Sequence, residues 1–444
     1  MASLLIEQEA AYPFIRLAQP FAGLAGLPEF SRTLELGQPE LEVAISRVSD
    51  VSTLFPGLRS GDGRSYADNG GMTGACADED PALAAVKSIA EAAERYAMTV
   101  IDSAEVVVAT ANDLGEDAID WRLFPRCLEH EYARFPGIVP FDPNKKMRWV
   151  QGLSLTSARR LHVPVALTHI SSATRRAESF ALPISTGVAV HTDVYEATAR
   201  AIMEVVERDS IALTWYMRRP LARIATSSER AGRHAERFRA FERSQIEQYL
   251  FEATTDLGIP VVYGLMVSRG HASAATVVTA ACDLDPVSAC AKAMREAVST
   301  RLAVIATPDR PSSSDACIKL EHGAVFMGER ERMSEFDFLL KSPHSVDMHA
   351  LPNHDSGDSR RNLQWLIGRL REHAMEVVAV ELTTDDLRDS GLRAIRVVIP
   401  QLMPMSYVSL ARFLDHPRLR QYGEHVHGRP FTADMVNPLP QPFA

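Results

Sequence analysis

The chain has 444 residues, of which 46% are hydrophobic and 23% are charged, and its formal net charge is −10. This composition is typical of a soluble globular protein, and the acidic balance argues against a general nucleic-acid binder, which would carry a basic face. The five cysteines form no CxxC pair, no apolar stretch approaches about 18 residues, and the N-terminus lacks a secretion signal, so we expect a reduced, cytoplasmic protein without a membrane span.

Residues 1–55 are expected to form an N-terminal segment with a strand over 40–51, followed by one large domain over 56–444. Residues 56–79 are rich in Gly, Ser, Asp and Asn and come just before a capped helix. In such a loop, backbone N–H groups can bind a phosphate. The segment contains no GxxxxGK[ST] sequence, so it is not a P-loop. An ordinary long turn explains the composition equally well. The candidate phosphate contacts are Ser60, Arg64 and Thr73.

Three predicted helices share one register. Each begins at an aspartate, namely Asp80, Asp193 or Asp285, and proline follows in two of the three, as is typical of a helix start. Glu196, three residues after Asp193, resembles the second half of a capping box. A glutamate lies eleven residues after each aspartate, about 16 Å along the helix. The charged residues at matching depth are Glu91, Glu94 and Arg95, then Glu204, Glu207 and Arg208, then Glu296 and Arg301.

Two interpretations of these glutamate–arginine groups are open. Such pairs at i,i+4 spacing are common on solvated helix surfaces, where they contribute a few tenths of a kcal/mol. The threefold recurrence with matched N-caps, and the apolar surroundings of the middle copy, favour instead one shared site, because charges are rarely buried without a partner or a metal. We therefore expect Glu91 and Glu296, which lie 205 residues apart, to line a common cavity.

The remaining segments supply strands and surface. Hairpins are predicted from the stretches 147–155 and 162–170 and from 260–268 and 274–284, and a capped helix follows each pair. A further strand is expected within 98–110, a solvated basic helix over 221–250, and a polar surface excursion with mobile segments over 308–360. The fold class expected is α/β, one large domain of repeated strand–strand–helix units.

The end of the chain alternates prolines from 437 to 444, a pattern that favours extended polyproline II structure. A floppy tail is the common interpretation of such an end. A stiff tail held in a cleft is the alternative.

In this order and spacing, these segments resemble the YcaO family of ATP-dependent enzymes. The resemblance runs from about Ser60 to Ala444 and rests on the three helix motifs, on ISTGVAVHTD, on ELTTDDLRDSGLRAIRVVIPQL and on the terminal PLPQP. It implies a central ATP site in which glutamates hold Mg²⁺ and arginines contact phosphates. Thr186 and Ser299 depart from the family pattern, which often has Asn and Gln there. The implied magnesium ligands are Glu91, Glu94, Glu204, Glu207 and Glu296, and the implied phosphate contacts are Arg95, Arg208 and Arg301.

The PLPQP end resembles the family members that make azoline rings. It implies ATP-dependent cyclodehydration of Cys, Ser or Thr in a ribosomally made precursor peptide, as in bacteriocin biosynthesis, through phosphorylation of the backbone amide oxygen. By the same resemblance, Pro438, Pro440, Pro442 and the carboxylate of Ala444 order the active site. Formation of a peptide thioamide or amidine is one alternative, and a non-catalytic ATP-binding scaffold subunit is another.

The resemblance also implies partners. We expect a separate leader-binding or E1-like protein that grips the precursor peptide, and an FMN-dependent azoline dehydrogenase is a further implied partner. A homodimer is the oligomeric state that the resemblance implies. No nucleic acid and no membrane are expected to bind.

Overall fold

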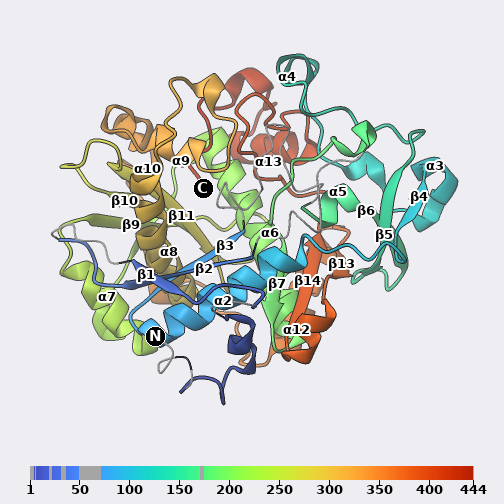
Figure 1. The fold of residues 1–444 in the computed structure, drawn as a ribbon. Coiled ribbons are helices and arrows are strands. Elements are labelled where there is room, and N and C mark those ends of the chain that lie inside the picture. Colours follow the sequence, from blue (N-terminus) through green and yellow to red (C-terminus); the bar gives the residue numbers. More distant parts are fainter. Residues whose placement is uncertain are drawn as a thin grey trace.

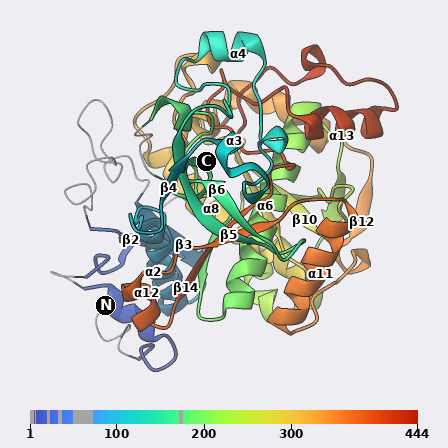
Figure 2. The same cartoon turned by 90° about the vertical axis from the view of Figure 1, so that its right-hand side faces the viewer.

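The computed structural model describes residues 5, 7–19, 23–31, 37–49, 72–170 and 175–443. Of the residues singled out above, Ser60, Arg64 and Ala444 lie outside this part of the chain. Within it, the strands form three sheets with helices packed on and between them, as two perpendicular views show (Figure 1, Figure 2). The expected α/β fold of strand–strand–helix units is confirmed.

The first unit has the antiparallel order β1-β2-β3 and carries α2 on one face. It joins strands of the N-terminal segment to β3, and β2 confirms the strand expected over 40–51. Gly74 in β3 lies so close to α2 that an added Cβ would clash with the Ser88 carbonyl oxygen. The small residues of α2 therefore make room for this strand. The bounds are β1 (Glu29–Ser31), β2 (Glu42–Arg47), β3 (Thr73–Asp78) and α2 (Pro81–Ala97).

The second sheet has the order β11-β10-β9-β8-β12, and α8 packs on its β10–β11 hairpin. This hairpin pairs Val261 with Cys282, and every residue of both strands is buried. The hairpin predicted from 260–268 and 274–284 is confirmed. The bounds are β8 (Ala222–Ala225), β9 (Glu247–Glu252), β10 (Val261–Val267), β11 (Thr276–Cys282), β12 (Ser345–Asp347) and α8 (Pro286–Ala306).

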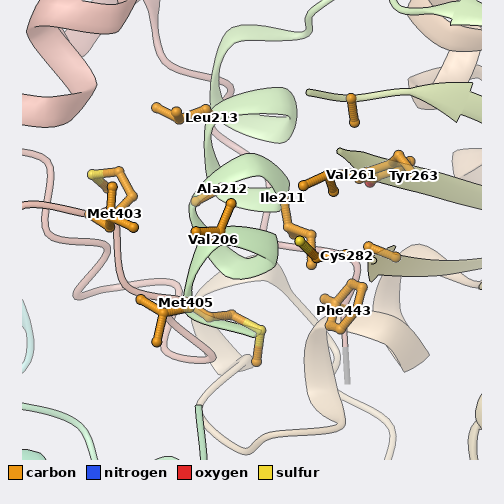
Figure 3. Packing of buried hydrophobic residues seen from close by; sticks show 14 of the residues in the cluster. Val206, Ile211, Ala212, Leu213, Val261, Tyr263, Cys282, Met403, Met405 and Phe443 are labelled. Carbon is orange, nitrogen blue, oxygen red and sulfur yellow. The ribbon is translucent and has the colours of Figure 1, made fainter. Parts of the chain in front are cut away.

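The third sheet follows the path β4-β5-β13-β14-β7, with β6 paired to β5. Helix α6 packs against β14 and β7 of this sheet and also against β11 of the second sheet, which buries it on nearly all sides. Figure 3 shows Val206 and Ile211 of α6 between the strand residue Val261 and the methionines Met403 and Met405. The bounds are β4 (Val107–Ala109), β5 (Met147–Ser154), β6 (Arg160–Pro164), β7 (Val188–His191), β13 (Val378–Glu381), β14 (Arg393–Val398) and α6 (Val194–Met217).

The remaining helices are short apart from α11 and α13, and they connect or cover the three sheets. Helix α11 packs against α6. The bounds are α3 (Ala111–Leu114), α4 (Glu129–Arg134), α5 (Val165–Thr168), α7 (Ala235–Glu242), α9 (His322–Met327), α10 (Asp337–Leu340), α11 (Ser359–Glu372), α12 (Asp385–Asp389) and α13 (Pro417–His427).

The three predicted N-caps are confirmed. Asp80 accepts the Ala82 amide at 2.8 Å and Asp193 accepts the Tyr195 amide at 2.8 Å, while Asp285 caps α8 through the amides of two first-turn residues. The capping box at Asp193 does not form: the Asp193 amide donates to His191 Nδ1 at 3.0 Å, and the Glu196 carboxylate accepts from Arg200 at 2.7 Å.

Four segments differ from their sequence-based expectations. Residues 221–250 hold β8, the short α7 and part of β9 in place of one long helix, since their apolar residues contribute to the second sheet. Within 308–360, the apolar run His322–Met327 forms a buried helix, and β12 joins the sheet, so this stretch is not only a surface excursion. Only the last part of 98–110 is a strand, and the segment 165–168 turns into α5.

All five cysteines are free thiols in the structure. No helix in the described ranges is long and apolar enough to cross a bilayer.

The close contact of β3 with α2 generates a first prediction. Gly74→Ala should lower the free energy of unfolding by about 1–3 kcal/mol, because the added methyl group overpacks a contact made by backbone atoms. The matched control is Gly26→Ala, whose Cβ would have its nearest neighbour, the Arg47 carbonyl oxygen, at 3.8 Å. This control should be neutral or stabilising by up to about 1 kcal/mol. Urea unfolding of both variants checks the prediction, and equal midpoints would contradict it.

Candidate functional site

A cavity of about 650 Å³ is lined by residues of α2, α6 and α8. Figure 1 shows these three helices near the middle of the molecule. Strands β3, β7 and β11 complete its walls, so each of the three sheets contributes to it. The prediction that Glu91 and Glu296 share one cavity is confirmed. The predicted residues that line it are Glu91, Glu94, Arg95, Glu204, Glu207, Arg208 and Glu296.

The glutamate–arginine pairs are not solvated surface pairs. Arg95 binds Glu91 at 3.0 Å on α2, and Arg208 binds Glu204 at 3.1 Å on α6. Arg208 also lies 3.4 Å from a Glu207 oxygen, and the Glu207 side chain is only 3% exposed. These ion pairs therefore belong to the cavity wall, where screening by water is weak.

Three of the carboxylates are fixed by backbone amides from three different sheets. Glu91 accepts the Ala75 amide of β3 at 3.0 Å. Glu204 accepts the amide of Gly187, just before β7, at 3.0 Å.

Glu207 makes the third such bond, accepting the amide of Cys282 in β11 at 2.9 Å. In each case a carboxylate oxygen is tied to the sheet that packs on or beside the helix. The position of each carboxylate in the cavity is therefore set by the fold.

Burial raises the pKa values of three carboxylates of the cavity, those of Glu91, Glu94 and Glu207. Burial raises the pKa of Glu207 to about 7, although Lys292 and Arg208 act in the opposite direction. Burial also raises the pKa of Glu94 well above its ordinary value, with Arg95 opposing this and Glu204 adding to it. Burial, the main cause, and the neighbouring carboxylates both disfavour the charged forms of Glu94 and Glu207, and a divalent cation bound beside them would favour those forms.

The donor chemistry of the cavity fits Mg²⁺. Carboxylate oxygens are the ligands that this hard cation prefers, and it is usually held by one or two carboxylates together with phosphate oxygens. Among the described residues there is no group of three or more His, Cys, Asp or Glu arranged to hold a metal alone. The guanidinium groups of Arg95 and Arg208 lie among the carboxylates and account for the separation of these carboxylates from one another. The arrangement suits a metal shared with phosphates.

Arg301 does not line the cavity. Its side chain is 1% exposed and its guanidinium donates to the Ala274 carbonyl. The spacing explains the difference, because a residue five positions after Glu296 is rotated by about 140° around the helix, whereas four positions give about 40°. The positions three and four after Glu296 are Ser299 and Thr300, and both line the cavity.

Several cationic side chains of the cavity were not predicted from the sequence. Lys292 and Arg295 on α8 line it, and Lys292 lies 3.8 Å from Glu207. Lys292 is four residues before Glu296, so helical periodicity alone places both on one face and could have identified it. Arg233 and Arg237 also line the cavity, and they come from a region that was predicted as a plain solvated helix.

The C-terminal tail is held by the body of the protein. The Asn437 amide donates to the Tyr216 carbonyl at 2.8 Å, and the Trp215 indole donates to the Leu439 carbonyl at 3.2 Å. Gln441 passes Gly323 of α9 so closely that a Cβ on this glycine would clash with the Gln441 carbonyl. The interpretation as a floppy tail therefore does not hold for residues 437–443.

The tail reaches the cavity through Phe443. This residue lines the cavity, and the Arg208 guanidinium carbon lies 4.7 Å from the centre of its ring. Figure 3 shows Phe443 beside Cys282 at the end of β11. Pro440 and Pro442 are buried and Pro438 is exposed, and none of the three lines the cavity. The alternating prolines were the sequence pattern that predicted a role for the tail, whereas the side chain that enters the cavity is that of Phe443.

Comparison with solved structures shows similar folds. A heterocyclase in complex with substrate and cofactor superposes with a TM-score of 0.80 at 21% identity, covering 98% of this chain and 57% of the other. The chain thus spans little more than half the length of that heterocyclase.

Two further structures are similar over most of both chains. YcaO from Methanopyrus kandleri, bound with AMPPCP and Mg²⁺, has a TM-score of 0.60 at 19% identity and 90% and 89% coverage of this chain and that one. The E. coli microcin synthetase McbBCD complex has a TM-score of 0.58 at 13% identity, with 87% and 90% coverage. At these identities the likeness concerns the fold.

Sequence comparison identifies the family. No curated protein matched the chain. The family model described as "YcaO cyclodehydratase, ATP-ad Mg2+-binding" matches residues 78–403, and this description confirms ATP and Mg²⁺ as the cofactors expected from the sequence. Because that match spans well over half of the chain and the fold agrees with it, the chain belongs to the YcaO family.

Proposed function

We propose that this protein is an ATP-dependent cyclodehydratase that converts Cys, Ser or Thr of a ribosomally made precursor peptide to thiazoline or oxazoline. The observation that supports it best is the cavity where carboxylates and guanidinium groups of α2, α6 and α8 meet the C-terminal Phe443. We propose ATP as the occupant of this cavity.

In the proposed reaction, the thiol or hydroxyl of the peptide adds to the carbonyl carbon of the preceding amide. The amide oxygen must then leave together with two hydrogens, so that each ring formed loses one water. ATP, bound with magnesium, would supply the phosphoryl group that makes this oxygen a good leaving group, so that the oxygen would leave within inorganic phosphate and ADP would remain.

The proposed roles of the chain's residues follow from their anchoring. Glu91, Glu204 and Glu207 each keep a fixed position through one backbone hydrogen bond, and their remaining lone pairs serve as magnesium ligands. Arg95 and Arg208 hold phosphate oxygens through their guanidinium donors. Preorganised charges of this kind stabilise the charge that develops on the transferred phosphoryl group.

Lys292 and Arg295 extend the proposed phosphate site along α8. Burial would disfavour the charged form of Lys292, yet its pKa is raised, because Glu207 and Glu296 lie close to it. It therefore stays protonated at neutral pH and adds positive charge where the phosphates are proposed to lie.

The proposed role of the tail is to close the cavity. Phe443 covers one face of Arg208 and excludes water from that ion pair, which strengthens its interaction with Glu204. The buried prolines Pro440 and Pro442 fix the extended backbone that delivers this ring. The carboxylate of Ala444, which is outside the described residues, stays a predicted contributor to the active site.

We further propose that a partner protein presents the peptide. The E. coli microcin synthetase with a similar fold is a complex of several proteins. A leader-binding or E1-like protein is the partner that this proposal requires. A homodimer and an FMN-dependent dehydrogenase remain predictions from the family resemblance.

One experiment separates the proposed reaction from its alternatives. A peptide rich in Cys, Ser and Thr is incubated with the protein, its partner, magnesium and ATP. The mass of the peptide is then measured by mass spectrometry. Loss of one water per ring supports cyclodehydration. Exchange of oxygen for sulfur marks thioamide formation, and bound ATP with an unchanged peptide marks a scaffold subunit.

Removing one proposed magnesium ligand should stop turnover. Glu204→Gln keeps an oxygen that can accept the Gly187 amide but removes the charge, so ring formation should fall at least about 100-fold with little change in stability. Glu236→Gln, an exposed residue of α7 outside the cavity, is the matched control and should leave the rate unchanged. Ring formation measured by mass spectrometry checks this. A normal rate for Glu204→Gln would contradict the metal role.

Displacing the tail should impair ring formation more than nucleotide binding. Gly323→Ala puts a methyl group where the Gln441 carbonyl passes, so the tail must move and Phe443 must leave Arg208. Ring formation should fall at least about 10-fold, as expected for a misplaced cavity wall, while ATP affinity measured by calorimetry changes less. Gly368→Ala on α11, with no atom within 4 Å of its Cβ, is the control. Equal rates for the two variants would refute the role of the tail.

A further inference from the structure

A second, smaller cavity of about 100 Å³ lies beside the first and has no role in the proposed reaction so far. Its walls are mostly apolar and come from α5, α6, β14 and the loops around residues 180–186 and 399–405. Met403 and Met405, which Figure 3 shows on the side of α6 away from Val261 and Cys282, are part of this lining. Among the described residues that line it, two have polar side chains, Thr186 and Arg396.

Helix α6 and the segment around Gly187 separate the two cavities. Glu204 lines the first cavity and Val205 the second. On either side of Gly187, Val188 lines the first cavity and Thr186 lines the second.

The wall at Gly187 has no room for a side chain. A Cβ there would lie 2.5 Å from the Val397 carbonyl oxygen and 2.7 Å from Val205. A ligand of the second cavity would therefore lie next to the carboxylates of the first.

The polar end of the second cavity has unused hydrogen-bond donors. One Arg396 nitrogen donates to the Ile184 carbonyl at 2.9 Å, but its Nε and the Thr186 hydroxyl are buried and have no partner among the described residues. Arg396 as a whole residue is only 7% exposed. Buried polar atoms are rarely left unpaired in native proteins, and a guanidinium Nε can only donate. The missing partner is a hydrogen-bond acceptor.

Charge and size narrow the choice of acceptor. Burial lowers the pKa of Arg396 to about 10, and Glu204 and Glu94 are near enough to act in the opposite direction. These carboxylates and the apolar lining disfavour a phosphate, so a neutral carbonyl oxygen is the better match. An engineered cavity of about 150 Å³ holds one benzene molecule, so about 100 Å³ offers room for one aliphatic side chain.

We propose that this cavity receives an aliphatic side chain of the precursor peptide next to the residue that is cyclised, with a backbone carbonyl of the peptide accepting from Arg396 Nε and the Thr186 hydroxyl. The proposal rests on the proposed function and adds a sequence preference to it. The shared wall makes this placement suitable, because a peptide residue held there lies beside the cavity in which the amide oxygen is proposed to be activated.

The test uses two small amides in place of the unidentified peptide. N-acetyl-L-leucine methylamide and N-acetylglycine methylamide are titrated against the free protein, without nucleotide, and binding is followed by ligand-observed NMR. The leucine compound should bind roughly 10- to 100-fold more tightly, as expected for burial of one leucine side chain. Thr186→Val, which keeps the shape but removes the hydroxyl, should weaken both amides by a similar factor.

Filling the cavity should abolish the preference for leucine. Ala166→Leu and, from another lining position, Ala181→Leu should each reduce the affinity for the leucine amide at least about 10-fold. Ala303→Leu, the same change at an exposed position of α8, is the control and should keep it. Thermal melting shows which filled variants remain folded.

Equal affinity for the two amides, or a leucine preference that survives in a folded filled variant, overturns the proposal. Since the titration requires neither nucleotide nor turnover, such a result leaves the ATP-dependent reaction standing. Conversely, loss of the proposed reaction would leave the binding preference measurable.

Discussion

Carboxylates that repel one another are held together around one cavity, and the rest of the fold provides what this requires. Each of three glutamates is anchored to a backbone amide from a different sheet. An amide of this kind favours the charged form and fixes the carboxylate without adding a competing cation. The cavity therefore forms only where three sheets and three helices have assembled, and its electrostatics depend on the whole domain.

Helix α6 has the largest share in this assembly. The residue after Arg208 is Asp209, which is fully buried and accepts two hydrogen bonds from Arg418 of α13 and one from the Met403 amide. Arg418 also binds Asp256, so one guanidinium joins three parts of the chain. Removing one partner of such a buried pair typically costs about 3–5 kcal/mol. The same turn of helix thus carries side chains that line the cavity and the contact that fixes its orientation.

Local patterns in the sequence were enough for the elements that surround the site. The N-caps at Asp80, Asp193 and Asp285 and the apolar β10–β11 hairpin are each determined within about ten residues, and the repeated register followed from them. Arg301 was misplaced because its spacing from Glu296 differs by one from that of the other two motifs, which rotates it away from the cavity.

Other features depend on contacts between distant segments, and local patterns do not report these. Phe443 meets Arg208 only because the tail crosses Gly323. The small cavity arises between the segments 180–186 and 399–405, which lie far apart in sequence. The buried run His322–Met327 was hidden by the polar composition of its neighbours.

The wall at Gly187 has a consequence for how members of such a family can diversify. Its backbone conformation has φ of +85°, which favours glycine, and the neighbouring strand leaves no space for a larger residue. The partition itself is therefore resistant to substitution, whereas Ala166, Ala181 and Leu182 on the far side can change size without touching the anchored glutamates. If the small cavity receives a peptide side chain as proposed, exchange of these apolar residues would change which side chain fits and would leave the anchored glutamates in place.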